Sequence, residues 1–375
     1  MLVAGDPTAP RPFSGSARSL VRALQARGAL HSAHDVTGWW DDPWSPRRDP
    51  GHLLARLRTG WLGHAAGSRR ASRLAAAHSG WDACLLYGTT FFPSGAAPVY
   101  CYFDATVAQN ARAGAWDTGW LPPRALQGQW ERQRQVFAAC AGLFPRSRWA
   151  GSTLAEDYDV PPEKVTVAGA GWNHEVEPPP HGPWDGQRAL FLGRAFERKG
   201  GPELLAAFTR ARAALPGARL TIVGCDPPAA RGLPGVEVLG PIDKDAPGGQ
   251  ARLLQLLART SLFCLPSRYE PFGVAVLEAM LSGVPCLVPD RFAFPEMVED
   301  GVAGRTYPAG DVAALARRLV ELLGDPAGLA RMGAAARADV LEHWSWDRAA
   351  ERICARVARD LATHRPQEAR SKAWA

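Results

Sequence analysis

The stretch that decides the fold is PSRYEPFGVAVLEA, residues 266–279. It follows a short apolar run at 261–265, which is typical of a buried strand. Pro271 suits the first position of a helix, so we expect a helix over 272–281. The N–H groups at the start of such a helix point away from it and favour a bound phosphate. The stretch therefore predicts a strand, a loop and a phosphate-binding helix.

Two glutamates flank this expected helix start. Glu270 lies just before it, at the mouth of the site, and Glu278 lies further inside the helix. A carboxylate repels a phosphate but suits sugar hydroxyls, as acidic residues do at the ribose of bound nucleotides. We therefore expect the backbone N–H groups of Phe272, Gly273 and Val274 to bind phosphate, with the two carboxylates nearby.

A second motif, FLGRAFERKGG, occupies residues 191–201. Arg194 and Lys199 bracket a strand-to-helix loop. A departing diphosphate develops negative charge, and two fixed cations stabilise that charge in the transition state. The alternative is ordinary surface charge, which is our interpretation of Arg198.

Together these motifs resemble the retaining GT-B glycosyltransferases of group 1, the family GT4. The resemblance runs from residue 189 to about 358 and includes the Trp-Ser-Trp of 344–346. It implies an α/β chain of two doubly wound parallel-sheet domains with a cleft between them. It also implies transfer of a sugar, expected to be a hexose, from a nucleotide-diphosphate sugar to an acceptor hydroxyl.

We assign the roles of the family's site residues only to positions where this chain has the residue of the family's motif. The resemblance implies that Arg194 and Lys199 hold the donor diphosphate. It implies that Glu278 binds the donor ribose and that Glu270 is the catalytic glutamate beside the transferred sugar. It also implies that the backbone of residues 272–274 contacts sugar and phosphate. The acceptor would attack the face that the diphosphate leaves, and a leaving-group oxygen would take the proton. A covalent intermediate on Glu270 is the less favoured variant.

The N-terminal half resembles the family less. Members have a Gly-Gly loop after the first strand, where this chain has Ser-Gly-Ser at 14–16, so Gly15 is the candidate for close approach of a diphosphate or acceptor. Members often place a His at the end of a mid-domain strand, where this chain has Asp104. Asp104 is expected to orient the acceptor or a donor hydroxyl; the alternative is a helix N-cap.

Apolar runs separated by polar segments indicate the remaining organisation. In the first half we expect strands at 2–4, 83–87, 98–103, 138–144 and 165–168. The Pro-rich segment 177–187 is the expected linker between an acceptor-side domain, 1–176, and a donor-binding domain, 188–346. Two final helices are expected at 312–323 and 346–361. The family implies that the last, about 347–375, packs back on the first domain.

We expect no metal and no cofactor apart from the nucleotide sugar. Asp157 and Asp159 have the Asp-x-Asp spacing of another glycosyltransferase architecture, and so do Asp243 and Asp245. The first pair reads as a helix end followed by a turn, and the second has a lysine between its carboxylates. Two rival functions remain open: a nucleotide-sugar-binding protein without turnover, and a glycoside phosphorylase that uses phosphate.

The charge and composition of the chain limit the classes of partner that it can bind. The net charge is +6, and residues 1–80 carry all of that excess. This basic region is either a solvated face or a contact with an anionic acceptor or membrane surface. The Trp- and Arg-rich composition of segment 37–73 is compatible with binding to nucleic acid or to a membrane surface. We favour two other interpretations, a pair of helices packed on the sheet or the wall of an acceptor pocket.

The acceptor class stays open among glycan, lipid and small molecule, and we expect no nucleic-acid partner. The N-terminal sequence is unlike a signal peptide, so we expect a cytoplasmic protein, at the inner face of the membrane if the basic region binds there. The seven irregularly spaced cysteines predict buried thiols instead of disulfides or a zinc site.

Overall fold

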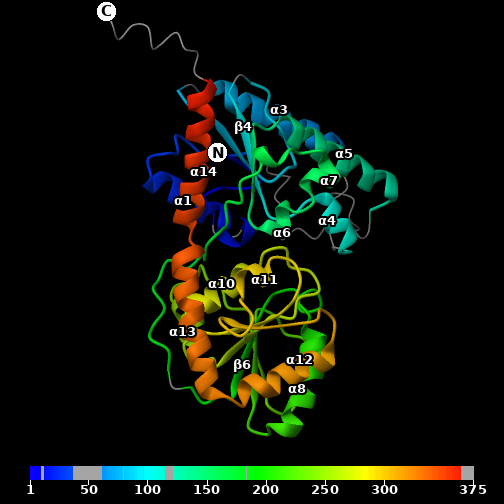
Figure 1. Cartoon of the computed structure of the whole chain (residues 1–375), viewed down its shortest axis with the longest axis vertical. Helices are drawn as coiled ribbons and strands as arrows, with labels where there is room; N and C mark the ends of the chain where they lie inside the picture. The colour runs from blue at the N-terminus through cyan, green and yellow to red at the C-terminus, as the bar shows by residue number, and fades with distance from the viewer. Residues whose placement is uncertain are drawn as a thin grey trace, which may run out of the picture. The chain divides into compact units, whose positions relative to one another are not determined.

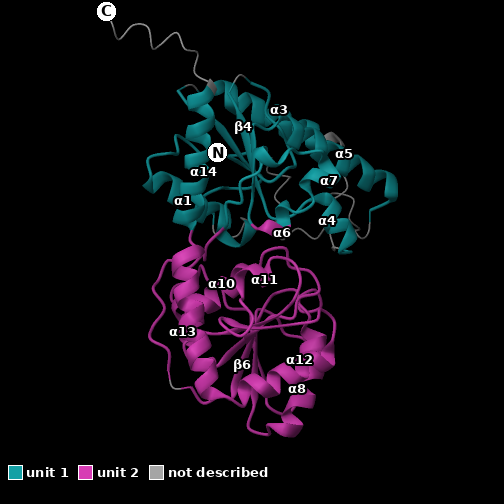
Figure 2. Cartoon of the chain, viewed as in Figure 1, with its two compact units in different colours: residues 1–146, 150–169, 346–375 teal, residues 147–149, 170–345 magenta. Residues whose placement is uncertain are grey.

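The chain forms two compact units in a computed structural model that describes residues 1–9, 12–36, 61–78, 80–95, 97–114, 121–182 and 184–364. Unit 1 comprises Met1–Arg146, Ala150–Gly169 and the residues from Trp346 onward, and unit 2 comprises Ser147–Trp149 and Ala170–Ser345 (Figure 2). The predicted linker, 177–187, lies inside unit 2, because the chain passes from one unit to the other at Gly169.

Unit 1 is built on a five-stranded, fully parallel sheet with the strand order β2-β1-β3-β4-β5. Its strands are β1 (Leu2–Val3), β2 (His34–Asp35), β3 (Cys84–Tyr87), β4 (Val99–Phe103) and β5 (Gly142–Pro145). The described α-helices of unit 1 are α1 (Ser16–Ala26), α3 (Trp61–Ala77), α4 (Val107–Arg112), α5 (Pro123–Ala139), α6 (Arg148–Gly151), α7 (Leu154–Tyr158) and α14 (Trp346–His364). The first two residues of α6 belong to unit 2. Short 3-10 turns occur at Pro12–Gly15 and Pro162–Lys164.

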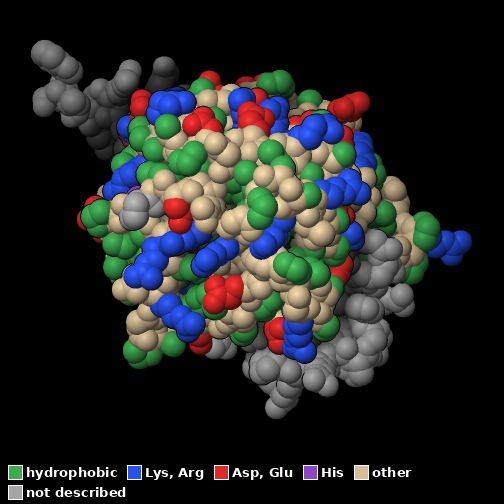
Figure 3. Space-filling view, turned by 90° about the horizontal axis from the view of Figure 1, so that it is seen from below, with side chains coloured by type: hydrophobic (Ala, Val, Ile, Leu, Met, Phe, Trp, Pro, Cys, Tyr) green, Lys and Arg blue, Asp and Glu red, His purple; other side chains and the backbone are tan. Residues whose placement is uncertain are grey.

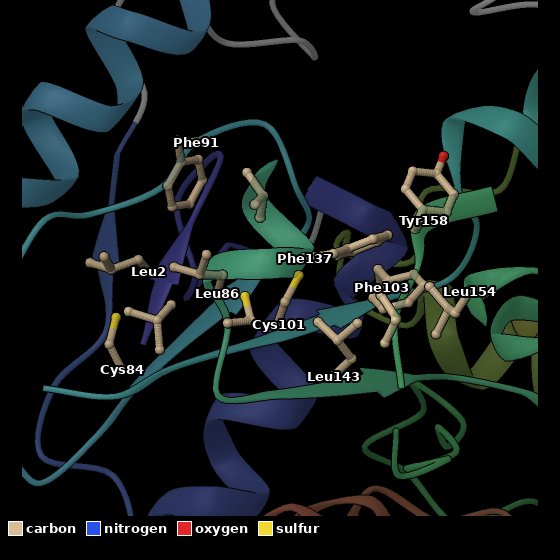
Figure 4. Close-up of a cluster of buried hydrophobic side chains, with 14 of the residues drawn as sticks. Leu2, Cys84, Leu86, Phe91, Cys101, Phe103, Phe137, Leu143, Leu154 and Tyr158 are labelled. Atoms are coloured by element: carbon tan, nitrogen blue, oxygen red, sulfur yellow. The ribbon is translucent and has the colours of Figure 1, made fainter. Parts of the chain in front are cut away.

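The core of unit 1 lies between one face of this sheet and helices α3, α5 and α7 (Figure 4). Leu86, Cys101 and Phe103 project from the strands and Phe137 from α5, and all four are at least 96% buried. The rings of Phe103 and Phe137 lie 5.0 Å apart, and Phe137 meets Tyr158 edge-on at 5.1 Å. This packing fixes the carboxyl ends of β3, β4 and β5, where polar residues follow each strand.

Unit 2 has a six-stranded parallel sheet with the order β11-β10-β9-β6-β7-β8. Its strands are β6 (Arg188–Leu192), β7 (Arg219–Val223), β8 (Val236–Gly240), β9 (Leu262–Cys264), β10 (Cys286–Pro289) and β11 (Gly304–Tyr307). Its α-helices are α8 (Gly201–Ala214), α9 (Gly249–Leu257), α10 (Val274–Leu281), α11 (Phe294–Met297), α12 (Val312–Leu323) and α13 (Pro326–His343), with a 3-10 turn at Pro228–Ala230. Helices cover both faces of the sheet: α10 and α13 one, α8 and α12 the other (Figure 1).

Three sequence predictions need correction. The run at 138–144 is the end of α5 followed by β5, and the segment 165–168 lies along β5 through single hydrogen bonds, such as Thr166 N to Leu143 O at 2.9 Å, without forming a regular strand. Helix α13 was missed because Gly328 and Gly333 interrupt its pattern. Its start is fixed by Asp325, whose carboxylate accepts from Gly328 N at 2.8 Å.

The last helix, α14, belongs to unit 1 and packs on α1 (Figure 1). Its buried face includes Ala349, Ala350 and Ile353. The Arg352 guanidinium donates to Ala168 O at 3.0 Å, where the chain leaves unit 1. Unit 1 is therefore completed by a segment that is distant in sequence from the rest of it.

The surface mixes charges of both signs: Figure 3 shows Lys and Arg side chains interspersed with Asp and Glu over one face. All seven cysteines are free thiols, as predicted, and five of them are buried. Among the described helices, none has the length and apolar character needed to cross a bilayer. Residues 37–60 of the Trp- and Arg-rich segment lie outside the described residues, and residues 61–73 form most of α3.

Candidate active site

The loop after β6 carries Arg194 and Lys199, the two predicted diphosphate-binding cations, which differ in their exposure and in their ion pairs. Arg194 is exposed and makes no ion pair within the described part of the chain, whereas the Lys199 ammonium contacts Glu270 Oε2 at 2.8 Å. Gly193 makes this possible, because a Cβ there would lie 2.3 Å from Lys199 Cδ. The loop therefore leaves one cation available to a ligand and binds the other to a carboxylate.

Glu270 is held by a second cation that the sequence did not single out. Arg198 Nη1 lies 3.3 Å from Glu270 Oε2 and also donates to Tyr269 O at 2.7 Å. The carbonyl of Arg198 accepts from Arg268 N at 3.0 Å. Our interpretation of Arg198 as ordinary surface charge was wrong: it joins the β6 loop to the loop that carries Glu270.

These contacts set the charge of Glu270, whose side chain is only 16% exposed. Burial raises the pKa of its carboxyl group, but Lys199 and Arg198 outweigh burial and hold the pKa below the ordinary value of a glutamate. Glu270 is therefore an anion at neutral pH, able to accept hydrogen bonds from sugar hydroxyls.

Helix α10 begins at Val274, later than predicted. Gly273 is its N-cap, with φ 82°, a left-handed conformation that favours glycine. Phe272 lies 98% buried against Trp344, with ring centroids 5.8 Å apart, so its side chain anchors the loop. In the first turn of α10, Val276 N donates to Gly273 O at 2.9 Å. The N–H groups of Val274 and Ala275 lie before the first regular helical hydrogen bonds, where a helix can bind an anion.

Glu278 lies in α10 and forms a second cluster, with its side chain only 3% exposed. The Lys244 ammonium donates to Glu278 Oε2 at 2.7 Å, and the backbone N–H of Asn173 also donates to this carboxylate. His174 Nε2 lies 3.8 Å from the same oxygen, too far for a hydrogen bond. Lys244, Asn173 and His174 were all missed as site residues.

The electrostatics of this cluster are those of a buried anion with a countercharge. Burial raises the pKa of Glu278, but Lys244 and His174 outweigh it and lower the pKa below the ordinary value. Burial lowers the pKa of His174, and Lys244 adds to this effect while Glu278 opposes it. At neutral pH the cluster therefore holds a carboxylate, an ammonium and a neutral imidazole.

In unit 1, Asp104 directly follows β4 and is 49% exposed at its side chain. Arg146, which follows β5 and is almost fully buried, lies 3.5 Å from it and also sits over the rings of Tyr87 and Tyr102, at 5.1 and 5.2 Å. The alternative of an N-cap is wrong, because Thr106 caps α4. Asp104 is thus a half-exposed carboxylate at the carboxyl end of the sheet, positioned by a buried cation.

Gly15 is the N-cap of α1, with φ 85°. Phe13 and Ser14, before it, are also left-handed, with φ 52° and 57°. The Phe13 ring packs on Tyr87, with centroids 4.8 Å apart. Gly15, Tyr87 and the Asp104–Arg146 pair thus share one region of unit 1, as the parallel order of β3, β4 and β5 requires.

The two Asp-x-Asp pairs have structural partners. Asp157 is buried and takes two hydrogen bonds from Arg112, one of them at 2.7 Å, and Asp159 pairs with Arg134. Asp243 accepts from the backbone N–H of Asp245 at 3.0 Å within a turn. Within the described ranges, no three His, Cys, Asp or Glu side chains are grouped to hold a metal.

A compositional signal could have found Lys244. The chain has 43 basic residues, but only four are lysine: Lys164, Lys199, Lys244 and Lys372. In so arginine-rich a chain, a lysine marks a place where a compact, flexible ammonium serves better than a planar guanidinium. Two of the four lysines contact the two site glutamates.

Comparison with known proteins gives a family match over the part of the chain that contains Glu270 and Glu278. Residues 186–325 match the family model described as glycosyl transferases group 1. The chain is 32% identical over 189 residues to a glycogen synthase of Mycobacterium tuberculosis, covering 48% of this chain and 44% of that one. It is 36% identical over 186 residues to a phosphatidyl-myo-inositol mannosyltransferase of Mycobacterium leprae, covering 48% of each. The chain thus spans about half the length of these curated relatives.

Solved structures match over more of the chain. A sucrose-phosphate synthase from Thermosynechococcus elongatus superposes with a TM-score of 0.72 at 17% identity, covering 97% of this chain and 99% of that one. Anabaena Alr3699/HepE, solved in complex with UDP and glucose, gives 0.59 at 15% identity, covering 90% and 88%. Two parallel α/β sheet units and these likenesses show that the chain has the GT-B fold.

Proposed function

We propose that this chain is a retaining glycosyltransferase of the group 1 type, which moves a hexose from a nucleotide-diphosphate sugar to an acceptor hydroxyl. The observation that carries this proposal is the arrangement around α10. A half-buried carboxylate with two cations precedes the helix, and a fully buried carboxylate with one cation lies within it. The family match of residues 186–325 covers these two glutamates and all three cations.

The donor fits this arrangement part by part. Arg194 and the first N–H groups of α10 would bind the diphosphate, and Lys199 would share its charge between Glu270 and a phosphate oxygen. Glu278 would accept hydrogen bonds from the ribose, and Glu270 from the transferred sugar. The solved structure of Anabaena HepE with UDP and glucose supports a donor of this class.

The reaction forms a bond between the acceptor oxygen and the anomeric carbon, and breaks the bond from that carbon to the diphosphate oxygen. The acceptor proton goes to a leaving-group oxygen. Arg194, Lys199 and the helix N–H groups stabilise the charge that grows on the diphosphate, so we propose that no metal is needed. Asp104, held by Arg146, would orient the acceptor or a donor hydroxyl, and Gly15 would let the acceptor or the diphosphate approach the backbone closely.

The experiment that tests this function is acceptor-free hydrolysis of UDP-, GDP- and ADP-sugars by the full chain. We expect slow release of the nucleoside diphosphate from one donor class. Arg194→Met should lower kcat about 100-fold or more with a smaller change in KM. Arg210→Met, at an exposed arginine on α8, is the matched control and should leave both unchanged.

Two results would contradict the proposal. Nucleotide binding without any release of sugar, with or without a broad panel of glycan, lipid and small-molecule acceptors, would indicate a binding protein. Release of a sugar phosphate from a glycoside and inorganic phosphate, with no action on nucleotide sugars, would indicate a phosphorylase.

A further inference from the structure

Three of the four lysines lie within the described residues, and they divide into two kinds. Lys164 is half-buried and donates to a backbone carbonyl, Ala138 O, at 3.0 Å. Lys199 contacts Glu270 at 2.8 Å, and Lys244 contacts the buried Glu278 at 2.7 Å. Lys199 belongs to a recognised motif, but Lys244 belongs to none and still needs an explanation.

The loop that carries Lys244 is tightly folded. Asp243 O accepts from Ala246 N at 3.3 Å, and Ala246 O accepts from Gly249 N at 2.9 Å. A Cβ at Gly249 would lie 1.9 Å from Asp243 O, so the loop closes on itself there. The ammonium of Lys244 therefore approaches Glu278 from a folded turn at the start of α9, with its side chain 36% exposed.

A third segment, 173–175, completes the surroundings of Glu278. The Asn173 N–H donates to the carboxylate, and Glu175 N is tied to Gln250 Oε1 of α9 at 3.2 Å. Between these two anchors, the His174 side chain is fully buried, and neither ring nitrogen has a hydrogen-bond partner among the described residues. A buried imidazole without a partner is costly, which points to a ligand that supplies the partner.

We propose that Lys244 and His174 form, with Glu278, the subsite that recognises the vicinal hydroxyls of the donor nucleoside. Lys244 keeps the buried carboxylate charged and oriented, and the neutral imidazole of His174 takes part in the hydrogen bonds to the same pair of hydroxyls. This inference rests on the proposed function, because Glu278 faces ribose only if the ligand is a nucleotide. It adds two residues from segments outside the recognised motifs.

The test is the affinity of the full chain for UDP, GDP and ADP, and for the 2′-deoxy and 3′-deoxy forms of whichever binds. Wild-type protein should prefer the ribonucleotide by at least about tenfold, since a buried charged acceptor loses a partner in the deoxy forms. Lys244→Met and His174→Phe should each weaken ribonucleotide binding about tenfold and bring the ribo-to-deoxy ratio toward one. Lys164→Met, a matched change in unit 1, should leave affinity and ratio unchanged.

Lys244→Gln is the second variant should Lys244→Met fail to fold, and it should lower the ratio in the same way. If the Lys244 variants kept the full wild-type preference for ribose, the inference would be wrong while the proposed function stood. If wild-type protein bound none of the three nucleoside diphosphates, the proposed function would be wrong and the subsite with it.

Discussion

At the scale of single residues, each glutamate of the candidate site is paired with at least one cation of the same chain. Glu270 is paired with Lys199 and Arg198, and Glu278 with Lys244. Each carboxylate stays ionised because its countercharge outweighs the cost of burial. A bound donor must therefore either break these ion pairs or form additional hydrogen bonds with their members. The exposed Arg194 can bind a phosphate without breaking an ion pair.

The Asp-x-Asp pairs lead to a prediction about metals. We expect full donor hydrolysis after exhaustive dialysis against EDTA, because fixed cations already surround the proposed diphosphate position. Asp243→Asn and Asp159→Asn should also leave kcat within about twofold, since both side chains serve local contacts on the surface. Loss of turnover with EDTA, restored by magnesium or manganese, would contradict this assignment.

Asp157 needs a different control, because it is a buried partner of Arg112. Asp157→Ala removes two hydrogen bonds from Arg112, whose side chain is 54% exposed, and should cost about 1–3 kcal/mol of folding free energy. A loss of activity in Asp157→Ala would therefore be interpreted only together with its unfolding midpoint.

At the scale of helices and strands, the sequence predicted most of unit 2 and less of unit 1. α12 has the predicted bounds, 312–323, because its apolar residues follow a clear helical period that ends before Gly324. α10 starts two residues later than predicted, since Gly273 takes a left-handed conformation that no residue pattern indicates. The surroundings of Glu278 could not be predicted, because 173–175, 243–249 and α10 meet only in three dimensions.

Gly273 gives a prediction at this scale. Gly273→Ala should destabilise the chain, because its φ of 82° is unfavourable for alanine and its Cβ would lie 2.6 Å from Phe294 Cε1. Gly310→Ala is a matched control, with φ 85° and open space around its Cβ. We expect a loss of about 1 kcal/mol for Gly310→Ala and about 1–3 kcal/mol more for Gly273→Ala, measured by chemical denaturation. Equal losses would show that the contact with Phe294 is easily relieved.

At the scale of the whole molecule, the last helix of the chain stabilises the first unit. α14 packs on α1, and Ile353 on its inner face is 3% exposed. The first unit is thus complete only when the C-terminal segment is in place, although about 180 residues of unit 2 separate the two in sequence.

Ile353→Ala should therefore lower the unfolding free energy of unit 1 by about 2–4 kcal/mol. Hydrogen exchange should show the loss of protection in α1 and α14 and leave α13 unchanged. Glu351→Ala, at a side chain 50% exposed on the same helix, should change stability by less than about 0.5 kcal/mol. Loss of protection confined to unit 2 would contradict this placement of the helix.

We propose above all that one nucleotide sugar spans both glutamates, with Glu278 at the nucleoside and Glu270 at the sugar. Glu270→Ala and Glu278→Ala separate the two roles when nucleoside diphosphate affinity and donor turnover are measured on the same samples. We predict that Glu270→Ala binds the nucleotide nearly as wild type but loses turnover by about 100-fold or more, whereas Glu278→Ala weakens binding by about tenfold or more. Unchanged nucleotide affinity in the Glu278 variant, or unchanged turnover in the Glu270 variant, would contradict the claim.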